Sequence, residues 1–403
     1  MKQKTIGIII AIELMVVILV PLFTINRIEG RVSETENRVL RSFPAVLDVN
    51  GNLRPNYLSE LDDWFKDNIG LREPMRNLCG IVDYNLMHKS ASPKVELGKE
   101  GWLYYTEENN VDIAKGTYPD FTDEEMETIC SQMEQVRKKL ESQGKEFVFV
   151  IPPSKASIHP EYIESADCQV METQIDRFAD YLEAHTDVKV VRLKDALLEE
   201  KSKSEEPLFF KTDTHWNYHG RYVGYKTIIE DLNGWGLIDS QPIEANFYED
   251  GPKSGDLAKL MGAVNLSGDK MEDDSFSAFE LKEHHAIEMT SGDWVEDFYK
   301  LLDSENVYYN GKAWENDAKK DAPTILWYGD SMMASGKYKE LTGEGIMEYI
   351  AEHFSETWFI WSYEIKQDDI DYVEPDIVVL DISERGFRRN LPGLFDEFLK
   401  EGK

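Results

Sequence analysis

Residues 145–155 read KEFVFVIPPSK and residues 324–331 read TILWYGDS, and these two stretches decide the fold. Each begins with a short apolar run, which is typical of a buried strand. Each run ends in a polar turn, PPSK in the first and Gly-Asp-Ser in the second. Further strand patterns alternate with helical patterns over 145–233 and 324–400. This alternation predicts an α/β protein whose mainly parallel sheet is covered by helices on both faces.

Apolar spacing outside the two stretches predicts the remaining elements. Helices are expected at 57–68, 73–87, 123–143, 172–186, 218–232, 343–353 and 392–400, and Thr122 is a suitable N-cap for the third of them. Strands are expected within 94–105 on both sides of a glycine turn, and at 188–193, 207–210, 357–361 and 376–380. Residues 240–322 are polar and rich in Gly, Ser, Asp and Glu, which predicts an irregular or β-rich insertion.

The stretch KTDTHWNYHGRY (211–222) contains candidate catalytic residues. In an extended strand, Asp213 and His215 point the same way, so the carboxylate can accept a proton from one imidazole nitrogen. That pairing leaves the other nitrogen free to act as a base. An ordinary surface pair on a strand is the alternative.

Ser331 is the candidate for the group that this base activates. It follows an apolar strand in Gly-Asp-Ser, with a helix expected after it, so its hydroxyl is exposed and its amide can face an oxyanion. An ordinary strand-to-helix turn with a capping Ser or Asp is the alternative. The two motifs together predict a Ser-His-Asp site made of Ser331, His215 and Asp213.

Several polar segments follow predicted strands, which is where α/β proteins place their sites. These segments are 152–155, the Asp213 and His215 motif, Ser331 and 383–385. We therefore expect them to meet at one edge of the sheet.

Aromatic residues beside the motif are candidates for binding a sugar. Trp216, Tyr218 and Tyr222 are expected to form the wall of a groove, although a packed core position is the more common outcome for a Trp. Arg385 is a further candidate for substrate binding; pairing with nearby carboxylates is the alternative for it and its neighbours Arg388 and Arg389. Lys155 suits a position in the site or on the surface.

Metal and cofactor chemistry are not expected. Asp213, His215 and His219 are possible ligands, but a helical zinc motif requires Glu where Trp216 stands. The three cysteines allow one disulfide at most, and no C-x-x-C pair indicates a zinc site.

The net charge of −33 excludes a nucleic-acid partner, because 44 Lys and Arg against 77 Asp and Glu cannot neutralise phosphates. Hydrophobic residues make up 41% of the chain, which is enough to pack a core. The acidity therefore indicates a solvated surface rather than disorder.

The N-terminal stretch TIGIIIAIELMVVILVPLFTI (5–25) is about long enough to cross a bilayer. Lys2 and Lys4 precede it and no small-residue cleavage site follows, so we predict an uncleaved signal anchor with the remainder outside the cytoplasm. Arg27 and Arg31 on the far side oppose this orientation. The predicted organisation is an anchor at 1–26, a helical lead at 27–93 and a catalytic domain at 94–403 with the insertion at 240–322.

Seven motifs in order along the chain resemble one family. They are SETENR with a following FP (33–44), GKEGWLYY (98–105), the strand with PPSK (147–155), TDTHW (212–216), SGDLAKLMG (254–262), YGDS (328–331) and ISER (382–385). Together they are similar to the SGNH-hydrolase-like acetyltransferases of the AlgX/AlgJ type and the related DHHW proteins. The resemblance implies a three-layer SGNH-hydrolase-like fold in which Ser331 is the nucleophile, His215 the base and Asp213 its orienting partner.

The resemblance also implies a membrane-anchored, extracytoplasmic O-acetyltransferase of an exopolysaccharide or cell-envelope glycan. A multi-pass acyltransferase of the membrane-bound O-acyltransferase type is the implied source of acetyl groups. The acidity does not favour a polyanion such as alginate as the acceptor. A carbohydrate acetyl esterase with the same triad, and a non-catalytic cell-envelope or polysaccharide-binding protein, are the alternatives.

Overall fold

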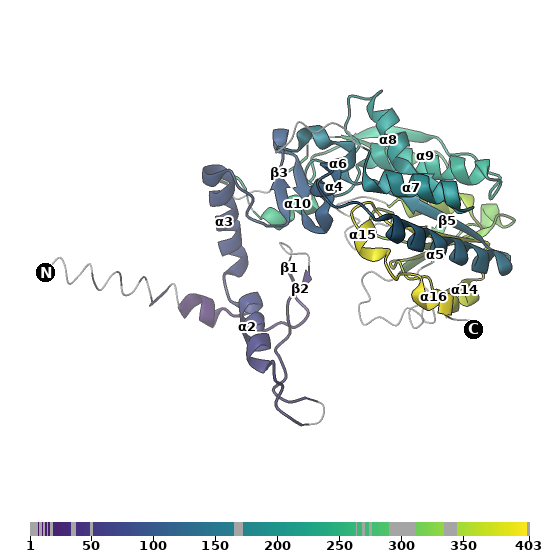
Figure 1. Ribbon diagram of the computed structural model, residues 1–403. Helices are drawn as coiled ribbons and strands as arrows, with labels where there is room; N and C mark the ends of the chain where they lie inside the picture. Colours follow the sequence, from purple (N-terminus) through teal and green to yellow (C-terminus); the bar gives the residue numbers. More distant parts are fainter. Residues whose placement is uncertain are drawn as a thin grey trace. The chain divides into compact units, whose positions relative to one another are not determined.

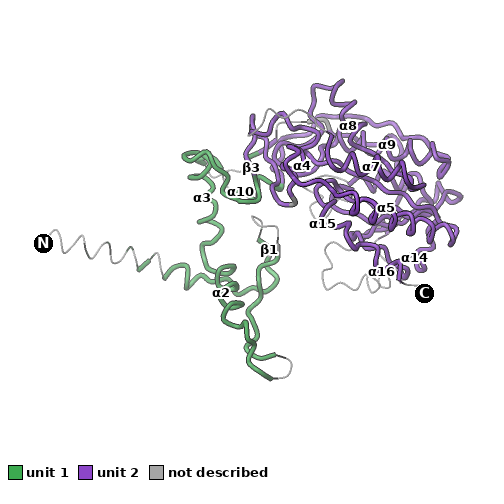
Figure 2. Tube along the Cα trace, in the orientation of Figure 1, with its two compact units in different colours: residues 1–95, 256–271 green, residues 96–255, 272–403 purple. Residues whose placement is uncertain are grey.

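The computed structural model describes the chain except residues 1–6, 8, 9, 11, 12, 14, 17, 18, 34–37, 49, 50, 165–171, 263, 268–270, 274, 275, 290–310, 334–344 and 401–403. The chain divides into two compact units (Figure 2). Unit 1 comprises residues 1–95 and 256–271, and unit 2 comprises residues 96–255 and 272–403. Part of the predicted insertion, residues 256–271, therefore groups with the N-terminal segment.

A seven-stranded sheet forms the centre of unit 2 (Figure 1), in the order β6, β5, β13, β11, β12, β10, β9. The first five of these strands are parallel: β6 (Lys189–Arg192), β5 (Glu146–Ile151), β13 (Ile377–Asp381), β11 (Thr324–Tyr328) and β12 (Glu356–Ile360). The last two, β10 (Gly311–Glu315) and β9 (Ile287–Glu288), are antiparallel to their neighbours.

The sheet is therefore mixed, and the prediction of a mainly parallel sheet is corrected. Both antiparallel strands lie within residues 240–322, for which the sequence predicts an irregular or β-rich insertion. Only residues 316–323 separate β10 from β11. A parallel return needs a crossover of about a dozen residues or more, so β10 has to run the opposite way.

Alternating side chains of the strands feed two separate hydrophobic cores. Val148, Val150 and Trp327 belong to the core beneath α8 (Leu193–Lys201), α9 (Tyr218–Gly234) and α13 (Ile346–Ile350). Phe147, Phe149 and Leu326 belong to the core beneath α5 (Asp123–Ser142), α7 (Gln174–His185) and α14 (Gln367–Val373). The predicted three-layer arrangement with helices on both faces is confirmed.

Side-chain caps fix where the main helices begin. Thr122 accepts from the amide of Glu125, and the Glu125 carboxylate accepts in return, so α5 starts with a capping box. Thr173 and Asp176 form the same arrangement at α7. Asn217 caps α9, immediately after the motif that contains His215.

Some predicted elements differ from the structure. Residues 207–210 form an isolated bridge between Phe209 and Trp216 instead of a strand. Helices α8 and α14 were not predicted from the sequence. The helix expected directly after Ser331 falls largely in 334–344, outside the described residues.

The remaining elements of unit 2 are short. They are β4 (Leu103–Tyr105), α4 (Asn110–Ala114), α6 (Lys155–Ile158), β7 (Ala245–Asp250), β8 (Phe276–Leu281), α15 (Phe387–Asn390), α16 (Asp396–Lys400) and 3-10 turns at Lys99–Gly101, Glu107–Asn109, Pro160–Tyr162, Asp317–Lys319 and Ala351–His353. The strands β7 and β8 pair as an antiparallel ribbon. β3 (Val95–Leu97), at the boundary of the two units, pairs with β4.

Unit 1 contains the helices α2 (Tyr57–Asn68), α3 (Arg72–Met87) and α10 (Asp256–Met261) and the short strand pair β1 (Val32–Ser33) and β2 (Arg38–Val39). The first two helices match the predicted ones within a residue. Residues 19–23 are helical and belong to the apolar stretch 5–25. Among the residues that are described, no helix is both long and apolar enough to cross a membrane.

Candidate active site

Three neighbouring parallel strands deliver three loops to one edge of the sheet. β13 lies between β5 and β11, so the segments 152–155, 382–385 and 329–331 all begin at the carboxyl ends of adjacent strands. Backbone hydrogen bonds tie two of the loops together, because the Glu384 amide donates to the Pro152 carbonyl at 2.8 Å. This edge is where the sequence places the candidate residues.

Asp213 and His215 form a close pair. One oxygen of the Asp213 carboxylate lies 2.6 Å from His215 Nδ1 and accepts the His215 amide at 2.9 Å. Within the described part of the chain, His215 Nε2 is buried and has no hydrogen-bond partner. The predicted extended strand is wrong, since residues 211–215 form a series of bends. The pairing instead comes from a turn closed by the carboxylate on the amide two residues later.

Buried charged groups hold this bend in place. Lys155, from the PPSK loop, donates to the carbonyls of Phe210 (3.2 Å), Lys211 (3.1 Å) and Asp213 (2.6 Å). Lys155 is buried and is therefore a structural support of the motif rather than a surface residue. These backbone carbonyls do not belong to a β-strand ladder, and the Lys155 ammonium group donates a hydrogen bond to each of them.

Asp273 also supports this bend. Its carboxylate accepts the Thr212 hydroxyl at 2.5 Å and the Thr212 amide at 3.2 Å. Burial raises the pKa of Asp273. Gly255 allows a close approach here, because a Cβ at this position would lie 2.4 Å from the Thr212 carbonyl oxygen. The Gly255 amide donates to the Thr212 hydroxyl at 2.9 Å.

Ser331 lies in a turn directly after β11. The preceding Asp330 carboxylate accepts the Met332 amide at 2.8 Å, the Tyr363 hydroxyl at 2.8 Å and the Ser383 hydroxyl at 2.6 Å. Arg385 donates to Ser331 Oγ at 3.0 Å. Asp330 therefore anchors the turn, while the Ser331 hydroxyl faces the guanidinium of Arg385.

Trp216 connects the two motifs. It is fully buried, and its Nε1 donates to the Met332 carbonyl at 3.0 Å, one residue after Ser331. The expectation that Trp216 lines a sugar groove is therefore wrong. Tyr218 is also buried and accepts from Lys253 at 2.8 Å, whereas Tyr222 is partly buried and packs against Phe279 of β8.

A second carboxyl group lies directly beneath the Ser331 turn. Asp381, the last residue of β13, is fully buried and accepts Trp327 Nε1 at 2.5 Å. Its second oxygen has no hydrogen-bond partner among the described residues. A Cβ on Gly329 would lie only 1.6 Å from the Asp381 carboxyl oxygen. Glycine is therefore required at 329 for the turn to rest on Asp381.

We expect Asp381→Asn to make stability less sensitive to rising pH above the ordinary Asp pKa. Burial and the neighbouring Asp330 raise the pKa of Asp381 well above its ordinary value. The protonated Asp381 carboxyl therefore adds to the free energy of unfolding. This contribution is fully present below the ordinary Asp pKa and is lost as pH rises through the raised pKa. Asparagine keeps the shape without the titrating proton. Melting temperatures measured across pH should fall more slowly for the variant; parallel curves for the two proteins would contradict this.

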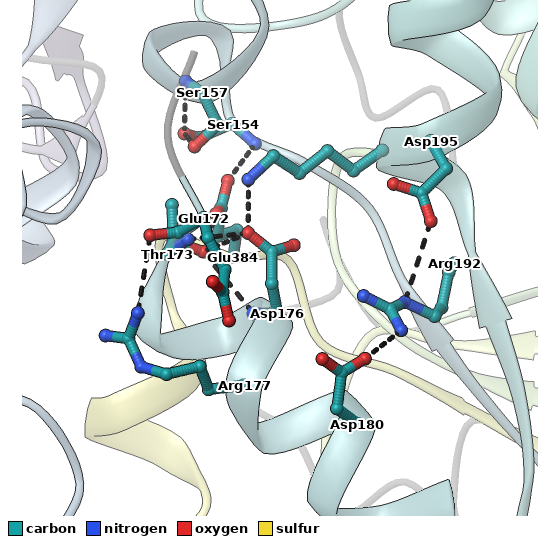
Figure 3. A network of polar contacts seen from close by, with 11 residues as sticks. Ser154, Ser157, Glu172, Thr173, Asp176, Arg177, Asp180, Arg192, Asp195 and Glu384 are labelled. Atoms are coloured by element: carbon teal, nitrogen blue, oxygen red, sulfur yellow. Dashed lines mark hydrogen bonds and ion pairs between the residues drawn. The ribbon is translucent and has the colours of Figure 1, made fainter. Parts of the chain in front are cut away.

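Glu384 joins the loops to helix α7. It accepts the Ser154 amide at 2.9 Å and the Thr173 hydroxyl at 3.0 Å. The Asp176 carboxylate accepts a hydrogen bond from the Thr173 amide and another from the Lys194 ammonium group at 2.5 Å. Figure 3 shows this network, in which Glu384 lies between Ser154 and the start of α7. Since Arg385 follows Glu384, the network fixes the backbone from which Arg385 reaches Ser331.

A cavity of about 20 Å³ adjoins the candidate residues, room for about one water molecule. Its lining comprises Tyr104, Tyr105, Asn110, Pro153, Ser154, Lys155, Ala156, Thr214, Met332, Ser383 and Arg385. His219 lies on α9 and is 2.9 Å from a carboxylate oxygen of Glu200, away from the pairing of Asp213 with His215. Of the other two arginines, Arg388 lies 3.3 Å from Glu125, as carboxylate pairing predicts.

Sequence reasoning missed Asp273 and Asp381. Asp381 had a usable signal, because it is the single charge that ends the otherwise apolar run Ile377–Asp381. Asp273 had no such signal, because it lies in a polar segment with several acidic residues, and nothing in the sequence distinguishes it from them.

Residues 95–292 match the family model described as "SGNH hydrolase-like domain, acetyltransferase AlgX". The resemblance predicted from the motifs is thereby confirmed, as is an SGNH-hydrolase-like α/β fold. The chain is also similar to the "Probable alginate O-acetylase AlgJ" of Pseudomonas fluorescens, with 28% identity over 189 residues, 45% of this chain and 44% of that protein. The counterpart from Pseudomonas aeruginosa is 24% identical over 225 residues, 54% of each chain. The chain thus spans about half the length of these relatives.

One similar solved structure is the O-acetyltransferase domain of Pseudomonas putida AlgJ. It is 15% identical with a TM-score of 0.46, covering 76% of this chain and 99% of that domain. Another is Bacillus cereus PatB1, 16% identical with a TM-score of 0.48, covering 74% of this chain and 96% of that one.

Proposed function

We propose that this chain, which matches the AlgX-type acetyltransferase model over residues 95–292, is an O-acetyltransferase. Its acceptor is a hydroxyl group of an exopolysaccharide or cell-envelope glycan. The names of the relatives support acetyl transfer to a polysaccharide as the type of reaction.

One observation carries the proposal: His215 Nδ1 lies 2.6 Å from the Asp213 carboxylate. This contact fixes the tautomer that has the proton on Nδ1, so Nε2 keeps a lone pair. Because Nε2 is buried and has no partner among the described residues, it is suited to accept a proton from a substrate-facing hydroxyl. Trp216 joins this motif to the Ser331 turn through the Met332 carbonyl.

In the proposed reaction, His215 Nε2 takes the proton of Ser331 Oγ as that oxygen attacks the acetyl carbonyl. The leaving group of the donor takes the proton back, and the acetyl group remains as an ester on Ser331. A sugar hydroxyl then attacks the ester, His215 accepts its proton, and the proton returns to Ser331 Oγ. Asp213 stays ionised and stabilises the imidazolium that forms in each half.

Arg385 is placed to stabilise negative charge. Its guanidinium donates to Ser331 Oγ at 3.0 Å, which supports a role in orienting the hydroxyl and in stabilising the oxyanion. The sequence predicted substrate binding for Arg385, and this proposal specifies that role as contact with the reacting oxygen. The Ser331 amide is proposed as the second donor to the oxyanion.

The apolar stretch 5–25 is proposed as a single-pass anchor that leaves unit 2 outside the cytoplasm. A multi-pass acyltransferase in the same membrane is the proposed source of acetyl groups. Tethering raises the effective concentration of such a donor near Ser331 without any new contact. A hydrolase gains nothing from that position, which favours transfer over hydrolysis.

Acetyl transfer should be detectable with a small activated ester. We expect the chain, given p-nitrophenyl acetate and a panel of neutral, amino and acidic oligosaccharides, to accumulate acetylated sugar with a suitable acceptor. A bound and oriented sugar hydroxyl reacts in preference to water because the entropy of bringing it to the ester is already lost on binding. Mass spectrometry of the sugars measures the product. Release of acetate alone across the whole panel would replace the transferase with an acetyl esterase, and no turnover of the ester would favour a non-catalytic binding protein.

A further inference from the structure

Helix α3 (Arg72–Met87) has a continuous apolar stripe on its exposed face. Leu71, at its N-cap, begins the stripe, and Met75, Leu78, Val82 and Leu86 continue it at helical spacing. The exposed fraction of these side chains ranges from 40% for Val82 to 73% for Leu86. Such a row is unusual for a surface in water, where large apolar residues are normally scattered singly.

The opposite face of α3 packs within unit 1. Gly80 is buried on that face. At the edge of the stripe, Asn85 Nδ2 donates to the Val264 carbonyl at 2.5 Å. A Cβ at Gly262 would approach the Asn77 side chain to 2.9 Å. These contacts fix the rotation of the helix, so the apolar stripe cannot turn inward.

The stripe begins where the apolar stretch 5–25 ends. The Gly70 amide donates to the Pro21 carbonyl at 3.0 Å, and the Asn26 amide donates to the Asn68 carbonyl at 2.8 Å. A Cβ on Gly70 would lie 1.9 Å from the Thr24 hydroxyl. The turn between α2 and α3 is therefore held against the end of the apolar stretch. Phe23, also in this stretch, is 82% exposed.

Charge is divided unevenly between the two units. Unit 1 contains 14 Lys and Arg against 13 Asp and Glu, whereas unit 2 contains 30 against 64. Unit 1 is thus almost neutral, and unit 2 accounts for the acidity of the whole chain. A neutral unit can approach phospholipid headgroups, which repel an acidic one where the lipids are anionic.

We propose that α3 lies in the surface of a phospholipid bilayer with Leu71, Met75, Leu78, Val82 and Leu86 facing the acyl chains. The inference rests on the anchored arrangement in the proposed function. If residues 5–25 span the bilayer, the α2–α3 turn lies at the headgroup level, so the adjoining stripe meets lipid first.

The test measures the depth of single labels in the full chain, reconstituted in phosphatidylcholine nanodiscs. Nitrobenzoxadiazole is attached to Leu78→Cys or Val82→Cys, with Asp62→Cys on α2 as the matched aqueous control. Cys79 and Cys168 are replaced by Ser; Cys130 stays, because burial raises its thiol pKa to about 12. Two quenchers are compared, aqueous iodide and phosphatidylcholine with a nitroxide on its acyl chain. Acetyl-ester turnover of each labelled chain checks folding.

We expect the lipid nitroxide to quench labels at 78 and 82 and iodide to reach them several-fold less than at 62. Equal access of iodide to all three, with the chain still eluting with the nanodiscs, overturns the inference and leaves the anchor standing. Protection of 78 and 82 from both quenchers also overturns it, because a second copy or another protein then covers the stripe. If the chain does not enter the nanodiscs, both the proposed anchor at residues 5–25 and the inference about α3 are contradicted.

Discussion

Replacing Ser331 with alanine should reduce acetyl-ester turnover by about 10⁴-fold or more, because Ser331 is the proposed nucleophile and alanine cannot form the acyl-enzyme. The fold should remain intact. Ser331 Oγ accepts a 3.0 Å bond from Arg385, and that guanidinium lies at a loop where water can replace the hydroxyl. Turnover of p-nitrophenyl acetate and the melting temperature are the two measurements.

Ser362→Ala is the matched control. Ser362 follows β12, the strand beside β11, and its hydroxyl accepts only a local bond from the Glu364 amide at 3.0 Å among those described. This variant should keep the turnover of the unchanged protein. A wild-type rate in Ser331→Ala would remove Ser331 as the nucleophile. An acetyl adduct located by mass spectrometry on Ser331, and lost in the variant, would be the corresponding positive result.

Gly329→Ala should destabilise the protein by about 3 kcal/mol and remove most turnover. The added methyl group would lie 1.6 Å from a carboxyl oxygen of Asp381, a group that is fully buried and held by Trp327. Either the Ser331 turn lifts or Asp381 moves, and both changes displace Ser331. Denaturant unfolding and acetyl-ester turnover measure the two effects.

Gly234→Ala provides the control, because a Cβ there meets nothing within 4 Å and the residue ends α9. Its stability should be unchanged or slightly higher, since alanine is the better helix residue. The double variant Gly329→Ala with Asp381→Ala should be more stable than the sum of the single effects predicts, since removing the carboxyl makes room for the methyl. Strict additivity, or a stable and active Gly329→Ala, would show that Asp381 does not support the turn.

The sequence predicted most of the central elements because their signals are local. Apolar runs such as Ile325–Tyr328 report burial on both faces, and Thr122 with Glu125 reports a helix start. The order of strands was not readable in the same way. Strand β10 joins the sheet through β12, which lies beyond β11 in the chain, so its place in the strand order depends on a partner that no local pattern specifies.

The site was predictable in its residue types and less so in its geometry. Asp213 and His215 were identified as a pair, but the pair forms in a bend closed by side-chain bonds rather than in a strand. For Trp216, a sugar-binding wall and a packed core position were both considered, and its buried indole, which donates to the Met332 carbonyl, agrees with the core position. Adjacency in sequence does not reveal which way a side chain points once regular structure ends.

The sequence by itself determined the α/β class, the chain order of the motifs and the chemical types at the candidate site. These follow from periodicity and from residue identity, which act over a few neighbouring positions. Only the tertiary structure decided what supports those residues. Lys155 binds carbonyls more than 50 residues away, and Asp381 lies under a turn that follows a different strand. Such contacts form because parallel strands bring their carboxyl ends together whatever their separation along the chain, and there a buried charge must find its partners.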